Sequence, residues 1–216
     1  MGIIVVAGRK GGIGKSTIAG NLAGEFAAMD YRVVLLDADP QHSLVAWATE
    51  GDGLLANCVQ PVKDRNLDDL KHKTKSAERH ADIVIIDTPP GMPEITAEAM
   101  LLADLALLPC GPSPLDLFAL KDAISLALHA RAARGSKKPR IRLVPSRVLM
   151  NTTLGRGLQS SLEKMGRKVL PAISQRVALA QAVESGLTIG EFAPGSPSQE
   201  EFRNLAKAVN KLLARA

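Results

Sequence analysis

The chain has 216 residues, 46% hydrophobic and 23% charged, a composition typical of one globular domain over residues 1–216 and unlike a disordered chain or coiled coil. No apolar run approaches the ~18 residues of a membrane-spanning helix, the first residues lack a secretory-signal pattern, and Cys58 and Cys110 are too few for a disulfide framework. Lysine and arginine number 27 against 22 acidic residues, and aromatics are only 3%, which favours a duplex nucleic acid or an anionic membrane as partner over stacked single strands.

Short apolar runs alternate with stretches of helical periodicity along the chain. The runs predict buried strands at 3–7, 33–36, 83–86, 105–108, 141–145 and, more weakly, 169–172. The periodic stretches predict helices at 16–29, 66–79, 93–102, 115–134, 152–166 and 176–185, followed by a last helix that opens at Ser198. This alternation predicts an α/β fold with a mostly parallel, twisted sheet covered by helices on both faces. Ligands bind such sheets beyond the carboxyl ends of the strands.

A glycine-rich segment, Arg-Lys-Gly-Gly-Ile-Gly-Lys-Ser-Thr at 9–17, lies between the first predicted strand and helix. Its glycines let the backbone amides approach phosphate oxygens, while a lysine and a hydroxyl can hold the β- and γ-phosphates and Mg²⁺. The strict phosphate-loop pattern has a glycine where this chain has Arg9. The segment predicts a P-loop NTPase fold with ATP and Mg²⁺ as cofactors. The predicted binding residues are Lys10, Gly11, Gly12, Ile13, Gly14, Lys15, Ser16 and Thr17, with Ser16 on the metal.

A second lysine, Lys10, stands just before the glycine pair, where binding of one nucleotide by one subunit does not need it. The pattern Lys-Gly-Gly-x-Gly-Lys-[Ser/Thr] resembles the deviant phosphate loop of the ParA/MinD superfamily. The resemblance implies a slow ATPase that hydrolyses ATP to ADP and phosphate in a nucleotide-sandwich homodimer. In that dimer Lys10 would act on the partner's phosphates while Lys15 acts on its own.

Two acidic segments extend the resemblance. Leu-Leu-Asp-Ala-Asp-Pro-Gln at 35–41 is similar to the family's first switch, which implies that Asp39 is required for hydrolysis and that Asp37 lies near the metal waters. Helix capping or a strand-end turn stays open as the alternative for both. The apolar strand that ends at Asp87 resembles a Walker B strand, and Asp87 would bind a metal water.

Two later segments resemble the small ParF-like plasmid-partition ATPases. Pro-Cys-Gly-Pro-Ser-Pro-Leu-Asp-Leu at 109–117 is stiffened by its prolines and is similar to a motif of that branch at the dimer interface. The segment 173–176 is similar to the loop that faces adenine, which implies a nucleotide contact for Arg176.

Positive charge gathers in the second half, since residues 123–162 contain no acidic residue. Without interleaved aromatics, such a stretch favours salt-dependent, sequence-independent contact with duplex phosphates, and a solvated basic face is the alternative. The predicted DNA-binding residues are Arg131, Arg134, Lys137, Lys138 and Arg140. The chain starts directly at its first strand, so we expect no N-terminal helix-turn-helix.

The last helix is basic and amphipathic, so it could lie on a membrane as in MinD-type proteins, but its alanine-rich stripe favours packing on the sheet. The resemblance implies a cytoplasmic, nucleoid-associated ATPase for plasmid or chromosome partition, with a centromere-binding ParB-like or ribbon-helix-helix partner and no membrane contact. Three alternatives remain: a MinD-like membrane-cycling ATPase, a metabolic enzyme such as dethiobiotin synthetase, and a nucleotide-dependent scaffold.

Overall fold

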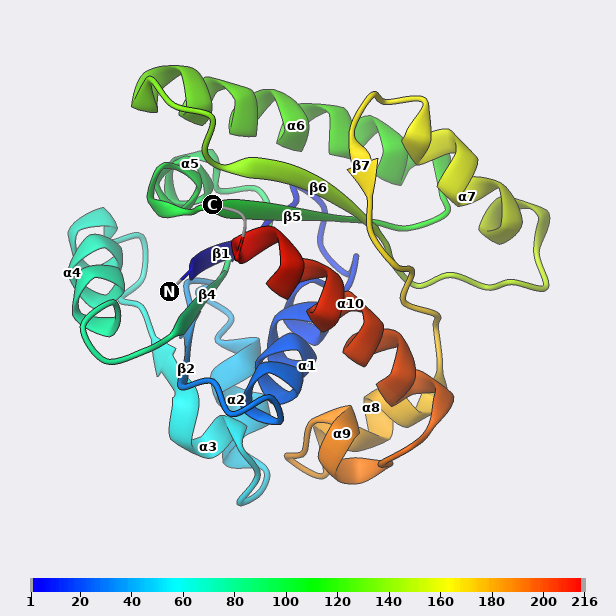
Figure 1. Cartoon of the computed structure of the whole chain (residues 1–216), viewed down its shortest axis with the longest axis horizontal. Coiled ribbons are helices and arrows are strands. Elements are labelled where there is room, and N and C mark those ends of the chain that lie inside the picture. Colours follow the sequence, from blue (N-terminus) through cyan, green and yellow to red (C-terminus); the bar gives the residue numbers. More distant parts are fainter. Residues whose placement is uncertain (1, 215–216) are drawn as a thin grey trace.

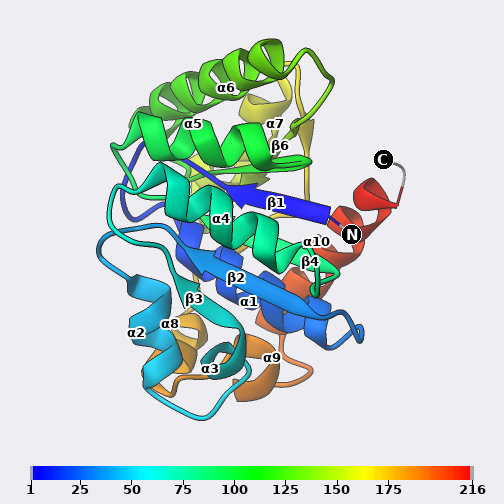
Figure 2. The same ribbon diagram turned by 90° about the vertical axis from the view of Figure 1, so that its left-hand side faces the viewer.

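A computed structural model describes residues 2–214. Its centre is a seven-stranded sheet in the order β3-β2-β4-β1-β5-β6-β7, in which all neighbouring strands are parallel. Helices cover both faces of this sheet (Figures 1 and 2). The predicted α/β class and parallel sheet are therefore confirmed.

The elements follow one another as the alternating pattern predicts. The strands are β1 (Gly2–Val6), β2 (Val33–Asp37), β3 (Val59–Pro61), β4 (Ile83–Asp87), β5 (Leu105–Cys110), β6 (Arg140–Pro145) and β7 (Lys168–Val169). The helices are α1 (Lys15–Ala27), α2 (Ser43–Thr49), α3 (Leu55–Cys58), α4 (Leu67–Ala77), α5 (Pro93–Leu102), α6 (Pro114–Arg134), α7 (Thr153–Glu163), α8 (Val177–Glu184), α9 (Ile189–Phe192) and α10 (Pro197–Leu213).

The central strands are apolar on both faces because each face is buried under helices. In β1, Ile3 and Val5 join the core beneath α4, α5, α6 and α7, while Ile4 and Val6 join the core beneath α1 and α10. Residues at successive positions of a strand point to opposite faces. The continuous apolar runs in the sequence therefore reflect this double burial.

Several short elements are not predicted from the sequence. β3 and the helices α2 and α3 lie between the second predicted strand and the 66–79 helix, where no run is long enough to show a period. β5 continues past its predicted end through Pro109 to Cys110. The strand tolerates Pro109 because the backbone N–H that proline lacks would face β1, and β1 pairs with β5 only as far as Leu107.

The last helix packs on the sheet, as its alanine-rich stripe predicts. Phe202, Leu205, Ala206 and Val209 are fully buried. The helix opens two residues before the predicted start, at the N-cap Ser196, whose hydroxyl accepts from the amide of Gln199. Within residues 2–214, no helix is both long and apolar enough to cross a membrane.

Candidate active site

The carboxyl ends of the strands meet around one open cavity of about 470 Å³. Its wall contains the phosphate loop, the first switch, the end of β6 and the start of α8. The lining residues include Gly11, Gly12, Gly14, Lys15, Ser16, Thr17, Asp39, Ser43, Ser146, Arg147, Ile173, Ser174, Gln175 and Arg176. The fold thus brings most of the predicted nucleotide-binding residues to one place.

The phosphate loop adopts a conformation that glycine accommodates best. Gly12 and Gly14 have φ angles of 70° and 89°, in the left-handed region. A Cβ atom at Gly14 would lie 2.7 Å from Ser146 Oγ, so this position also has no room for a side chain. Gly14 directly precedes α1, and the first residues of this helix line the cavity, where the free amides of a helix N-terminus can bind an anion.

Lys15 is the first residue of α1 and is only 6% exposed. Its Nζ donates to the carbonyl of Lys10 at 3.3 Å. Burial lowers the pKa of Lys15, and the negative charges of Asp87 and Asp39 oppose this shift. A buried ammonium with one carbonyl acceptor has donors left for phosphate oxygens.

Asp87 ends β4 beside the loop, and its Oδ2 accepts from Ser16 Oγ at 2.5 Å. Its Oδ1 is buried and has no hydrogen-bond partner within residues 2–214. Burial raises the pKa of Asp87 to about 7, opposed by the Ser16 hydrogen bond and Lys15 and reinforced by Asp37 and Asp39. A free carboxylate oxygen beside a serine hydroxyl suits Mg²⁺ held through water and phosphate.

No group of three or more His, Cys, Asp and Glu side chains within residues 2–214 could hold a metal by itself. Mg²⁺ is commonly bound by one or two protein oxygens together with waters and substrate phosphates. Ser16 and Asp87 fit that arrangement, so the metal would depend on the nucleotide for its remaining ligands.

Asp37 lies beside Asp87, because the two residues are register partners at the ends of β2 and β4. Its side chain is fully buried, and its oxygens accept from the amides of Asp39, Leu44 and Val45 at 3.0–3.2 Å. Burial raises the pKa of Asp37 despite these hydrogen bonds. The carboxylate therefore fixes the first switch to the start of α2, and its predicted place among the metal waters stays a prediction.

Asp39 lines the cavity with Lys15 and Ser16. One of its oxygens, Oδ1, accepts from the amide of Gln41 at 3.0 Å, and the side chain is 9% exposed. This hydrogen bond orients the carboxylate and leaves its other oxygen available. The place of Asp39 is compatible with the predicted role in hydrolysis, which stays a prediction.

Lys10 does not line the cavity that contains Lys15. Its Nζ lies 2.5 Å from Oδ1 of Asp116, at the start of α6. Asp116 belongs to the proline-rich segment, where it forms a capping box with Ser113. The two lysines of the phosphate loop thus point in different directions.

Two arginines, Arg147 and Arg176, line the cavity opposite the start of α1 in sequence, after β6 and before α8. Arg176 lines the cavity, as predicted for a nucleotide contact, and its guanidinium also donates to Glu201 of α10 at 3.0 Å. Arg147 lies in the acid-free stretch 123–162, and the sequence does not predict it as a site residue. It donates to the carbonyl of Gly12 at 2.5 Å. The signal for Arg147 is its place just after the carboxyl end of β6, where such sheets bind ligands.

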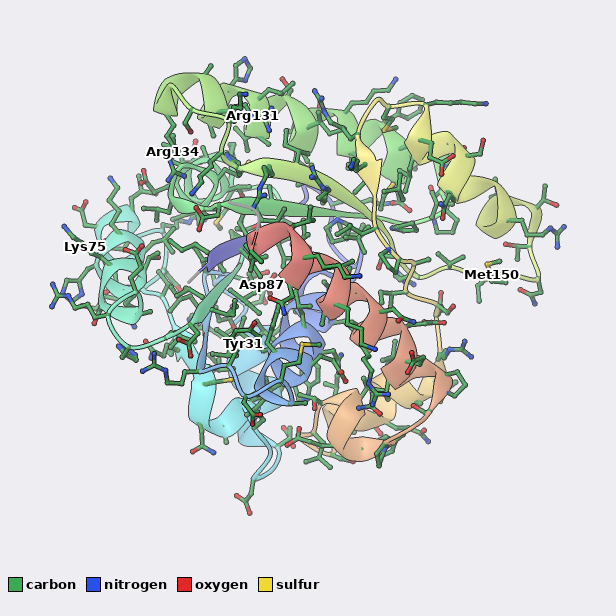
Figure 3. The ribbon with its side chains drawn as sticks, viewed as in Figure 1. Tyr31, Lys75, Asp87, Arg131, Arg134 and Met150 are labelled. Atoms are coloured by element: carbon green, nitrogen blue, oxygen red, sulfur yellow. The ribbon has the colours of Figure 1, made fainter. Side chains whose placement is uncertain are left out.

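The predicted DNA-binding residues lie at the opposite end of the sheet. α6 has 21 residues and spans about 31 Å, from the loop edge to the amino end of β5. There Arg131 donates to Pro139 O, Arg134 donates to Ala103 O, and Lys138 pairs with Asp104. Figure 3 shows Arg131 and Arg134 on this helix. Their DNA contact stays a prediction, although these three side chains already have partners.

The chain is similar to known nucleotide-binding proteins. A family model described as the CobQ/CobB/MinD/ParA nucleotide binding domain matches residues 4–189. The chain is 31% identical over 209 residues to the maintenance of carboxysome distribution protein A of Halothiobacillus neapolitanus, covering 95% of each chain. It is 32% identical over 241 residues to the chromosome-partitioning ATPase Soj of Thermus thermophilus, covering 95% of this chain and 94% of the relative.

Solved structures share the fold. An ATP complex of a McdA variant from Cyanothece has a TM-score of 0.80 at 19% identity, over 99% of this chain and 96% of the other. The septum site-determining protein MinD with Mg-ADP from Pyrococcus horikoshii has a TM-score of 0.76 at 22% identity, over 99% and 97%. The chain belongs to the CobQ/CobB/MinD/ParA nucleotide-binding family and, within it, is a ParA/MinD family ATPase.

Proposed function

We propose that the chain is a ParA-type positioning ATPase whose ATP-bound homodimer binds duplex DNA nonspecifically and is released by hydrolysis. The observation that carries the proposal is the arrangement of the two loop lysines. Lys15 lines the cavity with Ser16 and Asp39. Lys10 lies outside this cavity, where its half-exposed side chain forms an ion pair with Asp116. A lysine in that position can serve a second copy of the chain, as the resemblance implies.

In the proposed reaction, an oxygen of water forms a bond to the γ-phosphorus of ATP as the bond to the β-phosphate oxygen breaks. The loop amides and Lys15 hold the phosphates and neutralise developing charge, and Asp39 positions the water. Ser16 and Asp87 would hold the Mg²⁺, which offsets the charge of the β- and γ-oxygens. Catalysis in this scheme comes mainly from positioning.

An exposed apolar surface around Lys10 supports the homodimer. Leu115 and Phe118 of α6 are 65% and 61% exposed, and Leu149, Met150 and Leu154 after β6 are exposed as well. Leu149 lines one small cavity with Lys10 and Asp116, so the surface adjoins the loop edge. A second copy seated there would cover these side chains and bring its phosphates toward Lys10.

The cargo and the partner belong to the proposal too. We expect a cytoplasmic, nucleoid-associated protein, with a ParB-like or ribbon-helix-helix protein on plasmid or chromosomal DNA that stimulates hydrolysis. The proline-rich segment 109–117 supports a ParF-like relationship. A second candidate is the positioning of a protein body, because one relative covering 95% of the chain is a carboxysome distribution protein. Identifying the protein that stimulates hydrolysis distinguishes these two cargoes.

The membrane alternative loses its main support, because the apolar stripe of α10 is buried in the core.

The test of the proposed function measures ATP turnover without any small acceptor. It then measures binding to duplex DNA and to anionic vesicles with ATP, with ADP and without nucleotide. The proposal predicts slow turnover and ATP-dependent binding to duplex DNA. ATP-dependent binding to vesicles but not to duplex DNA would overturn it.

A further inference from the structure

The segment 173–176, which we call the cavity segment, lies between β7 and α8, and all four of its residues line the nucleotide cavity. On one side it is bonded to the chain that continues β6. The amides of Ile173 and Gln175 donate to carbonyls within residues 145–148, at 2.8 and 3.0 Å. Since successive amides of an extended segment point to opposite sides, the amide of Ser174 points away from these partners.

A carboxylate of α10 binds the other side of the cavity segment. Glu201 Oε2 accepts from the amide of Ser174 at 2.8 Å, and Glu201 Oε1 accepts from Ser174 Oγ at 2.8 Å and from Arg176 Nη2 at 3.0 Å. In Figure 1 the chain between β7 and α8 runs beside the beginning of α10. One side chain therefore holds the backbone and two side chains of the cavity segment.

The position of Glu201 is itself fixed by the core. The next residue, Phe202, is fully buried with Leu205 beneath α1 and α10. The side chain of Glu201 is 22% exposed and that of Arg176 is 40% exposed, so water screens their ion pair only in part. Hydrogen bonds to an ionised acceptor are also stronger than neutral ones. Glu201 can therefore restrain the cavity segment from a rigid helix.

The cavity offers two kinds of lining to a nucleotide. The phosphate loop and the start of α1 supply amides, Lys15 and Ser16, which suit phosphate groups. The cavity segment and α8 supply a second part of the lining, which includes the apolar residues Ile173, Leu179, Ala180 and Val183. Apolar surfaces with a few fixed polar groups suit a flat ring system. This division leaves the cavity segment and α8 for the base and ribose.

We propose that Glu201 is a positioning residue for nucleotide binding, which holds Ser174 and Arg176 where the cavity segment contacts the base and ribose of ATP. Glu201 does not line the cavity and so acts through the segment. A segment that is ordered before binding loses less conformational entropy when the ligand arrives. The inference rests on the proposed function only in that ATP occupies this cavity, and it needs neither the dimer nor DNA.

Loss of Glu201 should change affinity and leave the chemical step alone. Its hydrogen bonds to the cavity segment do not extend to the phosphate loop, Lys15 or Asp39. A substitution that removes binding shared by the ground state and the transition state raises KM and leaves kcat nearly unchanged. ATP and ADP carry the same base and ribose, so their affinities should fall together.

The test measures by calorimetry the affinities of the full chain and of its variants E201A and E201Q for ATP, ADP and inorganic tripolyphosphate, and it measures ATP turnover. Tripolyphosphate has no base or ribose, so it probes the phosphate loop alone. The matched controls are E200A and E200Q, which change the adjacent exposed glutamate, paired with Arg203 on α10 itself. E201Q keeps the side-chain size and one acceptor oxygen, so the test stands even if E201A folds poorly.

A hydrogen bond to a charged group is equivalent to about tenfold or more in an equilibrium constant. We expect E201A to bind ATP and ADP at least about tenfold more weakly, and E201Q to show a smaller loss of the same kind. Tripolyphosphate affinity should stay within about twofold of wild type, and kcat at saturating ATP within about threefold. Both Glu200 variants should match the wild-type chain in every measurement.

Unchanged ATP affinity in E201A and E201Q would overturn the inference. An equal loss of tripolyphosphate affinity would overturn it as well, because the whole site would then be distorted, and so would an equal loss in the Glu200 variants. Each of these results leaves the proposed function intact, since the wild-type chain still binds and hydrolyses ATP. A wild-type chain that does not bind ATP would overturn both.

Discussion

Lys10 Nζ lies 2.5 Å from Asp116 Oδ1, so the additional lysine of the phosphate loop is paired with the first turn of α6. The Asp116 side chain is 11% exposed, while that of Lys10 is 42% exposed. If Lys10 serves a partner's phosphates, it must exchange this carboxylate for them. In that case the ion pair shifts the monomer–dimer equilibrium toward the monomer.

Replacing Asp116 with asparagine should favour dimerisation. The amide removes the charge that holds Lys10 but can still accept from the Ser113 amide, so α6 keeps its cap. A half-exposed ion pair contributes on the order of 1 kcal/mol, equivalent to about fivefold in an equilibrium constant. We expect the ATP-dependent dimer of D116N to form at several-fold lower protein concentration.

The control for this variant is D122N, which removes the exposed ion pair between Arg9 and Asp122 on the same helix. Sedimentation velocity across a concentration series measures both. An unchanged or weakened D116N dimer, or an equal shift in D122N, would show that Asp116 does not restrain Lys10.

Replacing Asp39 with alanine should separate nucleotide binding from turnover. Its carboxylate faces the cavity but accepts only the Gln41 amide among described groups, so its loss leaves the phosphate loop intact. A side chain that positions the attacking water and accepts its proton typically contributes about 10²–10⁴-fold. We expect at least about 100-fold slower hydrolysis with ATP affinity within a few-fold of wild type, and no change in D52N, which alters an exposed carboxylate. Turnover by D39A near the wild-type rate would contradict this role.

Asp87 should make the nucleotide-free, metal-free protein less stable as the pH rises. Its pKa is about 7 in the folded chain and near 3.8 in the unfolded chain, so burial keeps it protonated when folded. The stabilisation present below pH 4 is therefore lost between about pH 4 and 7.

The variant D87N cannot ionise and should lack this contribution. Urea unfolding with a chelator at pH 5 and pH 8 measures it. We expect D87N to be more stable than wild type at pH 8 and to lose less stability between the two pH values. An identical pH dependence in both proteins would show that Asp87 is not the responsible group.

Cys58 and Cys110 should react slowly with thiol reagents. Both are buried, and burial raises the pKa of each thiol to about 12. Since the thiolate is the reactive form, labelling at pH 8 should be at least about 100-fold slower in the native protein than in guanidinium. Rapid labelling of the native protein would mean that α3, which ends at Cys58, or β5, which ends at Cys110, opens readily.

The phosphate loop is predictable from sequence because its chemistry is local. Gly12, Gly14, Lys15 and Ser16 lie within one turn between a strand and a helix, and all four line the same cavity. Asp87 is predictable because its strand is a plain apolar run that ends in a carboxylate.

Long-range partners are not predictable in this way. The pairs Lys10–Asp116 and Arg147–Gly12 join residues 106 and 135 positions apart, so only the folded sheet brings them together. The basic stretch shows a similar limit. Composition identifies an acid-free segment, but only the folded chain brings Arg131, Arg134 and Lys138 to their partners Pro139 O, Ala103 O and Asp104.

The most direct test of the account is the mass of the protein in solution, measured by sedimentation equilibrium with Mg-ATP, with Mg-ADP and without nucleotide. D39A is used to prevent turnover, and K10A is made in the same background. The account predicts a dimer only with Mg-ATP, and its loss in K10A while ATP still binds. The same mass in all three nucleotide states, or an ATP-dependent dimer that does not need Lys10, would contradict it.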